Sequence, residues 1–304
     1  MLMNGVLIID KPSGLTSHDV VNRVRRILQQ PSVGHLGTLD PLATGVLPLV
    51  TGSLTRLAQF YKLSEKTYEG VIRFGFATDT YDSDGEPSGP AREVNVLLED
   101  VRGMAERYVG LIDQTPPPFS AKKINGVPAY KLARKHKEVS LKPVKVEIKE
   151  FGILDLEGDR ARFRARVASG TYMRSVAHDM GQQIGCGAHL TALRRTVLGE
   201  FTLGDAHTLE ELTAAAQGGD EAAAMFIHPR RLLPQFPCVT ASDEVAAQIR
   251  NGRAVNLPEL SQAKQVKVFA GQSDLVAIAT RIAGTLFHPK IVLTGNKPSK
   301  KANE

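Results

Sequence analysis

The sequence predicts an α/β fold followed by a second, small and mostly β domain. Short β-branched runs typical of buried strands alternate with amphipathic helical patterns over roughly the first three quarters of the chain. Three prolines within residues 226–237 then precede closely spaced short strands. A chain of 304 residues can form one large and one small domain. We expect these domains at residues 1–230 and 231–295, with a disordered polar tail at 296–304.

The elements of the first domain follow from local patterns. A strand is expected at residues 6–9, and a helix capped by Ser17 and ended by Pro31 carries apolar residues at helical spacing. Further strands are expected at 68–76, 144–153 and 161–167, and further helices at 96–109, 176–184 and 209–225. Prolines and many basic residues in 114–143 predict a projecting insertion.

The second domain is expected to be mostly β. Its pattern predicts one helix at 243–249 and a turn at Asn251-Gly252. Strands are expected at 266–269, 276–279 and 291–293.

Composition indicates the class of partner and the cellular compartment. The net charge of +6 favours a polyanionic partner, because cationic side chains supply most non-specific affinity for nucleic acids. Two cysteines, Cys186 and Cys238, give neither a disulfide framework nor zinc spacing, which suits a reducing cytosol. We see no signal peptide and no run near the roughly 18 apolar residues of a membrane span. We expect a cytoplasmic protein. Basic residues cluster at 23–26, 122–123, 134–137 and 194–195.

Residues 34–45, GHLGTLDPLATG, place one carboxylate among glycines and ahead of a proline. Pro41 biases Asp40 toward an extended backbone, and the glycines allow a ligand to approach the main chain. A carboxylate held in this way can act as a nucleophile or as an electrostatic partner. The same residue types are common in ordinary turns, so the segment by itself leaves both interpretations open.

The segment resembles the signature of the TruB family of tRNA pseudouridine-55 synthases. Further blocks of that family follow in order: GVLIIDKPSGLTS (5–17), KTY (66–68), TDTYD (78–82), PPP (116–118), GTYMRS (170–175), GCGAHL (185–190) and LRR (193–195). The resemblance covers most of residues 5–200. It implies a pseudouridine-synthase catalytic fold with a mixed sheet and an inserted RNA-binding element. More loosely, the C-terminal segment resembles a PUA domain, an RNA-binding module.

The resemblance implies a catalytic trio. Asp40 matches the catalytic aspartate, and Arg174 matches the active-site arginine expected to pair with it. Tyr68 matches an active-site tyrosine that could stack on the flipped uracil and accept the C5 proton, directly or through water. Whether Asp40 attacks the base or the ribose, or takes a ribose proton, stays open.

Six further residues are implied in substrate binding. His35 matches a histidine that supports the displaced nucleotide, although its pKa range alone would favour a general base. In the block that contains Arg134 the sequence departs from the family pattern, because His136 replaces the usual glycine. Tyr172 and Leu193 match positions lining the uridine pocket, Asp79 and Arg134 look like members of a charge network around Arg174, and Lys11 suits a structural role beside the loop of Asp40.

The resemblance implies isomerisation of the uridine at position 55 in the T-arm of tRNA, without cofactor or metal. The acidic turn 79–85 lacks the glutamate that a calcium loop needs at its twelfth position. We expect a monomer that needs no guide RNA and no membrane. Two alternatives stay open: a non-catalytic protein that binds or folds tRNA, and a synthase subunit guided by a small RNA.

Overall fold

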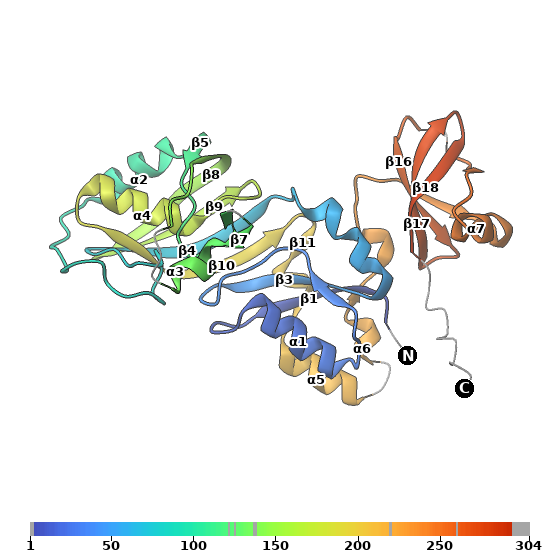
Figure 1. The fold of residues 1–304 in the computed structure, drawn as a ribbon, viewed down its shortest axis with the longest axis horizontal. Helices are drawn as coiled ribbons and strands as arrows, with labels where there is room; N and C mark the ends of the chain where they lie inside the picture. The colour runs from blue at the N-terminus through green and yellow to red at the C-terminus, as the bar shows by residue number, and fades with distance from the viewer. Residues whose placement is uncertain are drawn as a thin grey trace.

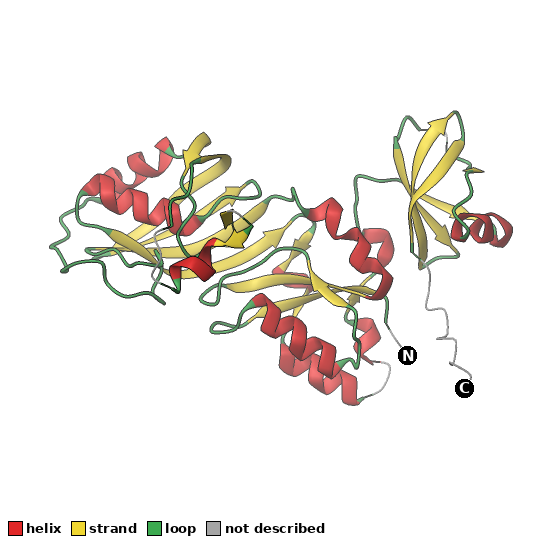
Figure 2. Ribbon diagram, viewed as in Figure 1, coloured by secondary structure: helices red, strands yellow, loops and turns green. Residues whose placement is uncertain are grey.

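The computed structural model describes residues 3–120, 122–124, 126–135, 139–218, 221–259 and 261–293. Within these residues the chain forms one eleven-stranded sheet, one five-stranded sheet and a two-stranded hairpin. The large sheet is long, and the small sheet with its helix lies at one end of the molecule (Figures 1 and 2). The predicted α/β fold with a mixed sheet and a small C-terminal β domain is confirmed.

The N-terminal half of the large sheet centres on two antiparallel strands. It contains β1 (Gly5–Lys11), β2 (Val33–His35), β3 (Thr44–Thr51), β12 (Ala206–His207) and β13 (Phe226–Ile227). Leu7 and Ile9 of β1 pack on the same core as Val20 of α1 (Ser17–Ile27) and Leu212 of α5 (Leu209–Gln217). Figure 1 shows both helices on one side of this half. Residues Val6 and Ile8, alternating with them, pack on the opposite side against the 3-10 segment η1 (Gly52–Tyr61).

The second half is an antiparallel sheet. It contains β10 (Ala188–Leu198), β4 (Lys66–Phe74), β9 (Arg160–Val167), β8 (Val144–Glu157) and β5 (Gly110–Gln114) in that spatial order. Apolar residues of β4, β8 and β9 pack with those of α2 (Leu98–Arg107) and α4 (Met173–Ile184) in the main core. The opposite face of β9 presents arginines at every second position, from Arg160 to Arg166.

The two halves meet at a short parallel contact between β3 and β10, which we call the seam. It consists of the pairs Arg194↔Thr44 and Arg195↔Gly45. Gly45 has φ +97°, and a Cβ there would lie 2.2 Å from the carbonyl oxygen of Arg195. A side chain at this position would therefore strain the backbone and also push the strands apart.

Part of the predicted insertion forms a small unit outside the two larger sheets. It contains β6 (Lys123–Ile124), β7 (Val127–Pro128) and α3 (Ala129–Ala133). The expectation is wrong for residues 114–120, because Gln114 belongs to β5 and the carbonyl groups of Thr115 and Phe119 accept hydrogen bonds from α4. This part of the insertion lies against the helix that carries Arg174.

The five-stranded sheet is built from residues 238–292. In spatial order it contains β14 (Cys238–Ala241), β16 (Gln265–Ala270), β17 (Asp274–Ala283), β18 (Leu286–Val292) and β15 (Val255–Asn256), and α7 (Asp243–Arg250) packs beside them. Phe269 and Ile278 share a buried cluster with Leu57 of η1. The buried ammonium of Lys267 donates to the carbonyl groups of Arg230 and Leu232 at 2.9 and 2.6 Å. The small domain is thus packed on the N-terminal half.

Several element boundaries differ from the sequence prediction. Thr16, not Ser17, caps α1, in a capping box with Asp19. The helix expected at 176–184 begins at Met173. The helix expected at 209–225 is divided into α5 and α6 (Glu221–Ala224). The short elements that the sequence did not predict include β11 (Phe201–Thr202), η2 (Leu203–Asp205) and η3 (Pro229–Arg231).

Two remaining expectations concern the chain ends and membranes. The polar tail at 296–304 lies outside the described residues. In the part of the chain that the structure describes, no helix is both long and apolar enough to cross a membrane.

Candidate active site

Asp40 lies in an irregular loop, residues 36–43, between β2 and β3. Its neighbours are fixed through their backbone. The ammonium of Lys11 and the backbone N–H of Gly14 both donate to the carbonyl group of Pro41, at 3.0 and 2.9 Å. The hydroxyl of Ser17 donates to the carbonyl of Leu39 and accepts its N–H. The loop is therefore held on both sides of Asp40, whose side chain stays 34% exposed.

The buried guanidinium of Arg195 holds the same loop from the side of the sheet. Its Nε donates to the carbonyl of Val46 at 2.8 Å, and its two Nη atoms donate to the carbonyls of Thr38 and Gly37 at 3.3 and 3.0 Å. On the adjacent position, Arg194 donates to both oxygens of Asp10 at 3.0 and 2.7 Å and to the hydroxyl of Thr44 at 3.3 Å. These arginines stabilise the seam, and the fully buried Arg195 is not accessible to a polyanionic partner as a member of the basic cluster at 194–195.

Arg174, from the second half of the large sheet, forms an ion pair with Asp40. It lies in the first turn of α4, 4% exposed, with its Nε 2.9 Å from Oδ2 of Asp40 and an Nη 3.0 Å from Oδ1. The Nε contact is poorly aligned for a hydrogen bond and counts as an ion pair. The predicted proximity of Asp40 and Arg174 is confirmed, and the pair joins the two halves of the sheet.

Other groups around Arg174 come from two further segments. The carbonyls of Thr80 and Phe119 accept its Nη atoms at 2.9 and 3.0 Å, and Oδ2 of Asp82 lies 3.4 Å away. Asp82 is as buried as Arg174. Burial raises the pKa of Asp82, while the hydroxyl of Thr80 and the charge of Arg174 oppose that shift. Arg174 is thus a buried cation between one buried and one accessible carboxylate.

The expectation that Asp79 belongs to this network is wrong. Oδ1 of Asp79 accepts the backbone N–H of Glu86 at 2.9 Å, inside the turn itself. Asp82 takes the expected place, held by the hydroxyl of Thr80 at 2.6 Å and by the N–H of Asp84 at 3.1 Å. The two aspartates lie three residues apart in one acidic turn, so no sequence pattern distinguishes which of them faces Arg174.

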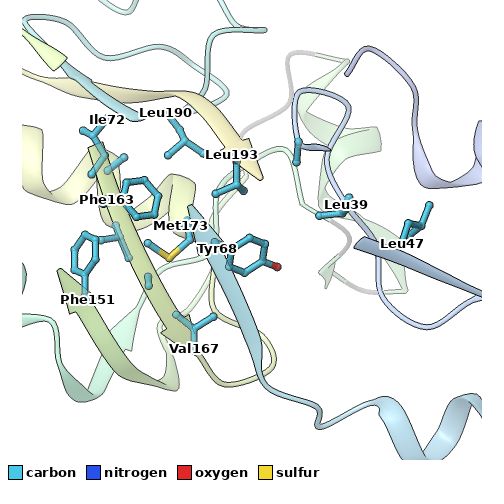
Figure 3. Packing of buried hydrophobic residues seen from close by; sticks show 14 of the residues in the cluster. Leu39, Leu47, Tyr68, Ile72, Phe151, Phe163, Val167, Met173, Leu190 and Leu193 are labelled. Atoms are coloured by element: carbon cyan, nitrogen blue, oxygen red, sulfur yellow. The ribbon is translucent and has the colours of Figure 1, made fainter. Parts of the chain in front are cut away.

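Tyr68 and Leu193 lie on the neighbouring strands β4 and β10. In register, Tyr68 pairs with Arg195, which itself pairs with Gly45 across the seam. Figure 3 shows Tyr68 and Leu193 at the edge of the apolar cluster, with the Tyr68 hydroxyl turned toward the half that carries Leu39. Both residues are 8% exposed. This part of the site is apolar, as a stacking surface for a base requires.

Tyr172 caps α4 at the entrance to the first turn. The side-chain amide of Gln114 accepts its N–H at 2.8 Å and donates to its carbonyl at 3.0 Å. Burial and the charge of Asp40 raise the pKa of the Tyr172 hydroxyl, whereas Arg174 opposes the shift. Tyr172 therefore lies within electrostatic reach of the Asp40–Arg174 pair.

The other predicted binding residues lie at varied places. His35 ends β2, and burial followed by the charge of Arg195 lowers its pKa. Lys11 is fully buried beneath the Asp40 loop, and burial lowers its pKa to about 8 although Asp40 opposes the shift. Arg134 ends α3 with its guanidinium 5.6 Å from the ring centroid of Tyr130. Within the described ranges no ion pair joins Arg134 to the network of Arg174.

A hollow of about 460 Å³ lies beside the seam. Leu42, Gly70 and Leu193 are among its lining residues, together with Arg162 and Arg194 on its polar side. Asp40 and Arg174 do not line it, so the hollow adjoins the site through Leu42 and Leu193. Among the described residues, no group of three His, Cys, Asp or Glu side chains is arranged to hold a metal ion.

Comparisons with known proteins agree with this geometry. Residues 25–173 match the family model described as the TruB family pseudouridylate synthase N-terminal domain. Residues 174–233 match the model of the tRNA pseudouridylate synthase B C-terminal domain. The border between the two models falls directly before Arg174, so each contributes one member of the ion pair.

Two curated relatives align over nearly the whole chain. A protein of Solibacter usitatus named tRNA pseudouridine synthase B is 51% identical over 294 residues, covering 96% of this chain and 100% of the relative. A protein of the same name from Burkholderia mallei is 38% identical over 299 residues, covering 96% and 98%.

Solved structures show the same fold at lower identity. A chain of an H/ACA RNP bound to a substrate RNA containing 2'-deoxyuridine has a TM-score of 0.70 at 23% identity, covering 96% of this chain and 85% of that one. A chain of an archaeal box H/ACA sRNP Nop10-Cbf5 complex has a TM-score of 0.69 at 24% identity, covering 96% and 87%.

Proposed function

Because the chain belongs to the TruB family of pseudouridylate synthases, we propose that it isomerises uridine at position 55 in the T-arm of tRNA. The observation that carries this proposal is the Asp40–Arg174 ion pair at the seam. In that pair the guanidinium is buried and the carboxylate remains one-third exposed. A carboxylate accessible at the edge of an apolar surface is the arrangement that a flipped nucleotide needs.

The reaction breaks the N1–C1′ bond of uridine, turns the base and forms a C5–C1′ bond. C5 then loses a proton and N1 gains one, so the atoms balance without an external group. Asp40 acts as nucleophile or charge stabiliser: it attacks C1′ or the base, or takes a ribose proton. Arg174 supplies the counter-charge at both oxygens of Asp40 and fixes their direction.

Tyr68 supplies the surface for the flipped base. Its ring is nearly buried beside Leu193, with its hydroxyl toward the half that carries Leu39 (Figure 3). A uracil stacked on this ring would place C5 within reach of the hydroxyl, directly or through a water molecule, as acceptor of the C5 proton. His35 supports the displaced nucleotide from the N-terminal half, and Tyr172 lines the uridine pocket.

The proposed substrate rests on the names of the relatives and on the charge of this chain. Relatives at 51% and 38% identity carry the name tRNA pseudouridine synthase B. The net charge of +6 suits an RNA partner. We propose that the chain acts as a monomer in the cytoplasm and that its domain at 231–295, which resembles a PUA module, adds contacts to the tRNA.

A guided synthase is the competing proposal, because the similar solved structures belong to H/ACA RNP assemblies. Identities of 23% and 24% carry the fold alone, whereas the near-identical length of the tRNA synthase relatives favours a stand-alone enzyme. The purified chain, incubated with an unmodified tRNA transcript and no guide RNA, should form pseudouridine at position 55.

Mapping of pseudouridine along the whole transcript is the readout. A transcript with cytidine at position 55 is the matched control and should remain unmodified. Binding of the transcript without any pseudouridine would support the non-catalytic alternative. Modification only after addition of a guide RNA would support the RNP alternative, and modification at a different uridine would overturn the proposed position.

A further inference from the structure

Tyr81 has a strained backbone at the edge of the candidate active site. Its φ of +65° lies in the left-handed region, which among the described non-glycine residues only Gln29 and Leu233 share. A bulky aromatic residue adopts this region at a cost in free energy, so surrounding contacts must hold it there. Strained residues of this kind cluster where a loop must present particular groups.

The two chain neighbours of Tyr81 are both groups that contact Arg174. The carbonyl of Thr80 accepts Nη1 of Arg174 at 2.9 Å, and Oδ2 of Asp82 lies 3.4 Å from the same atom. The left-handed turn at Tyr81 lets a carbonyl and a carboxylate one residue on either side converge on one guanidinium. The strained backbone of Tyr81 therefore lies between the two groups of the loop that contact Arg174.

The ring of Tyr81 stacks on His178. Their centroids are 3.7 Å apart and their planes 12° from parallel. His178 lies four residues after Arg174 on α4, so both side chains project from one face of that helix. The Nδ1 of His178 is buried and has no hydrogen-bond partner among the described residues, and burial lowers the pKa of its ring.

The loop and the helix therefore meet at two points, one turn of α4 apart. Thr80 and Asp82 hold Arg174 at the first point, and Tyr81 stacks on His178 at the second. These two points help to fix the rotation of the loop against the helix. The loop is also tied to β10, where Leu190 donates to the carbonyl of Tyr81 and accepts the N–H of Ser83, both at 3.0 Å.

We propose that Tyr81 and His178 are positioning residues for the isomerisation: their stack aligns the Thr80–Asp82 loop so that Arg174 presents both oxygens of Asp40 to the flipped uridine. This inference rests on the proposed function. It adds a pair that touches neither the nucleotide nor Asp40 and acts only through Arg174. Small displacements of a catalytic group can lower a rate by about 100-fold, so such a pair should influence the chemical step more than binding.

The test measures the single-turnover rate of tritium release from C5-labelled tRNA at saturating enzyme, beside the Kd for the same tRNA. Tyr81→Ala and His178→Ala should each lower the rate by roughly 10- to 100-fold, with the Kd within about threefold of the wild type. Tyr81→Phe and His178→Phe keep a stacking ring and should retain the wild-type rate within about twofold. The double alanine variant should be no slower than the slower single variant.

Two further variants separate stacking from other causes. Tyr81→Gly removes the ring and also relieves the backbone strain, so it should be as slow as Tyr81→Ala if the stack is what matters. Tyr108→Ala is the matched control: Tyr108 is a buried aromatic residue whose hydroxyl accepts from Gln183 near the far end of α4, at 2.8 Å. It should lower the melting temperature and leave the rate within about twofold.

The proposal is overturned if Tyr81→Ala and His178→Ala release tritium at the wild-type rate, if only the Kd changes, or if Tyr108→Ala is equally slow. A failure of Tyr81→Ala to fold leaves His178→Ala and His178→Phe as a complete test, because Tyr81 is unchanged in both. Wild-type protein without any tritium release from tRNA would instead contradict the proposed function, so the two failures are distinguishable.

Discussion

The two halves of the large sheet fix their charged residue in opposite ways. The N-terminal half holds the backbone around Asp40 through donors on Lys11 and Ser17, and it leaves the carboxylate one-third exposed; Arg195 of the second half adds hydrogen bonds to the same loop. The second half buries the side chain of Arg174 in a set of oxygen acceptors. An accessible carboxylate on a fixed backbone can contact a substrate. A buried guanidinium cannot, and it can only hold the carboxylate in place. The comparison supports the proposal that Asp40 is the reacting group and that Arg174 holds it in place.

The site exists only while the halves stay in register. Their backbones meet in two residue pairs at the seam, which is a small contact for a sheet of this size. Consecutive arginines reinforce it, Arg194 by pairing with Asp10 and Arg195 by binding carbonyls of the Asp40 loop. The predictions below disturb one half, the other half or the seam between them.

The largest loss of stability is expected from Arg195→Met. It removes hydrogen bonds to three carbonyls in or beside the Asp40 loop, and each buried acceptor left unsatisfied costs about 1–3 kcal/mol. Urea unfolding should show a decrease of roughly 3 kcal/mol or more in the free energy of unfolding. Arg194→Met, which breaks a half-exposed ion pair with Asp10, should cost about 1 kcal/mol or less. Equal losses would contradict the different roles of the two arginines.

A smaller loss is expected from Gly45→Ala at the seam. The new Cβ would meet the carbonyl of Arg195 in a backbone of φ +97°. We expect a decrease of about 2 kcal/mol or more in the free energy of unfolding, together with slower catalysis. Gly110→Ala is the matched control, because Gly110 has φ +106° and open space around its Cβ. It should lose about 1 kcal/mol and keep its activity. A control as damaging as Gly45→Ala would mean that close approach at the seam is unimportant.

His35→Ala tests the division of roles within the N-terminal half. His35 is proposed to support displaced RNA, so its loss should slow tritium release by about 10-fold, far less than Asp40→Ala. The single-turnover rate and the Kd for tRNA should both be measured. A loss as complete as that of Asp40→Ala would show that His35 takes part in the chemistry.

The smallest expected effect is a change in the free energy of unfolding with pH, caused by the titration of Lys11. Burial lowers its pKa in the folded state to about 8, from 10.5 in the unfolded chain. Between these values the unfolded chain binds the extra proton, so this group makes the free energy of unfolding rise as pH increases from about 8 to about 10. The contribution should be of order 1 kcal/mol. Urea unfolding across this range should show a weaker rise in Lys11→Met, and an unchanged slope would contradict the assignment.

The sequence predicted elements whose apolar residues follow a clear period. The strands at β1, β8 and β9 and the helix α1 were expected near their observed places, and β-branched or alternating residues explain why. The central strand β10 was not predicted, because Thr191 and Arg194 to Thr196 interrupt its apolar pattern. Arg195 is buried only because distant carbonyls of the Asp40 loop accept its hydrogen bonds. No local pattern reports such a partner.

For the site, motif resemblance paired Asp40 with Arg174 correctly and selected Asp79 where the structure has Asp82. The choice depends on the left-handed conformation of Tyr81, beside which the carbonyl of Thr80 and the carboxylate of Asp82 both approach Arg174. Backbone conformation at a single non-glycine residue is not encoded in any periodic pattern. The proposed roles of Tyr68, Tyr172, Leu193, His35, Arg134 and Lys11 await the same functional tests.

The central claim, that the accessible carboxylate of Asp40 carries the reaction, is tested most directly by Asp40→Asn. The amide keeps the size of the side chain and removes its charge. Single-turnover tritium release from C5-labelled tRNA should be abolished, while the Kd for the tRNA stays within about threefold of the wild type. Tritium release at the wild-type rate in this variant would contradict the account.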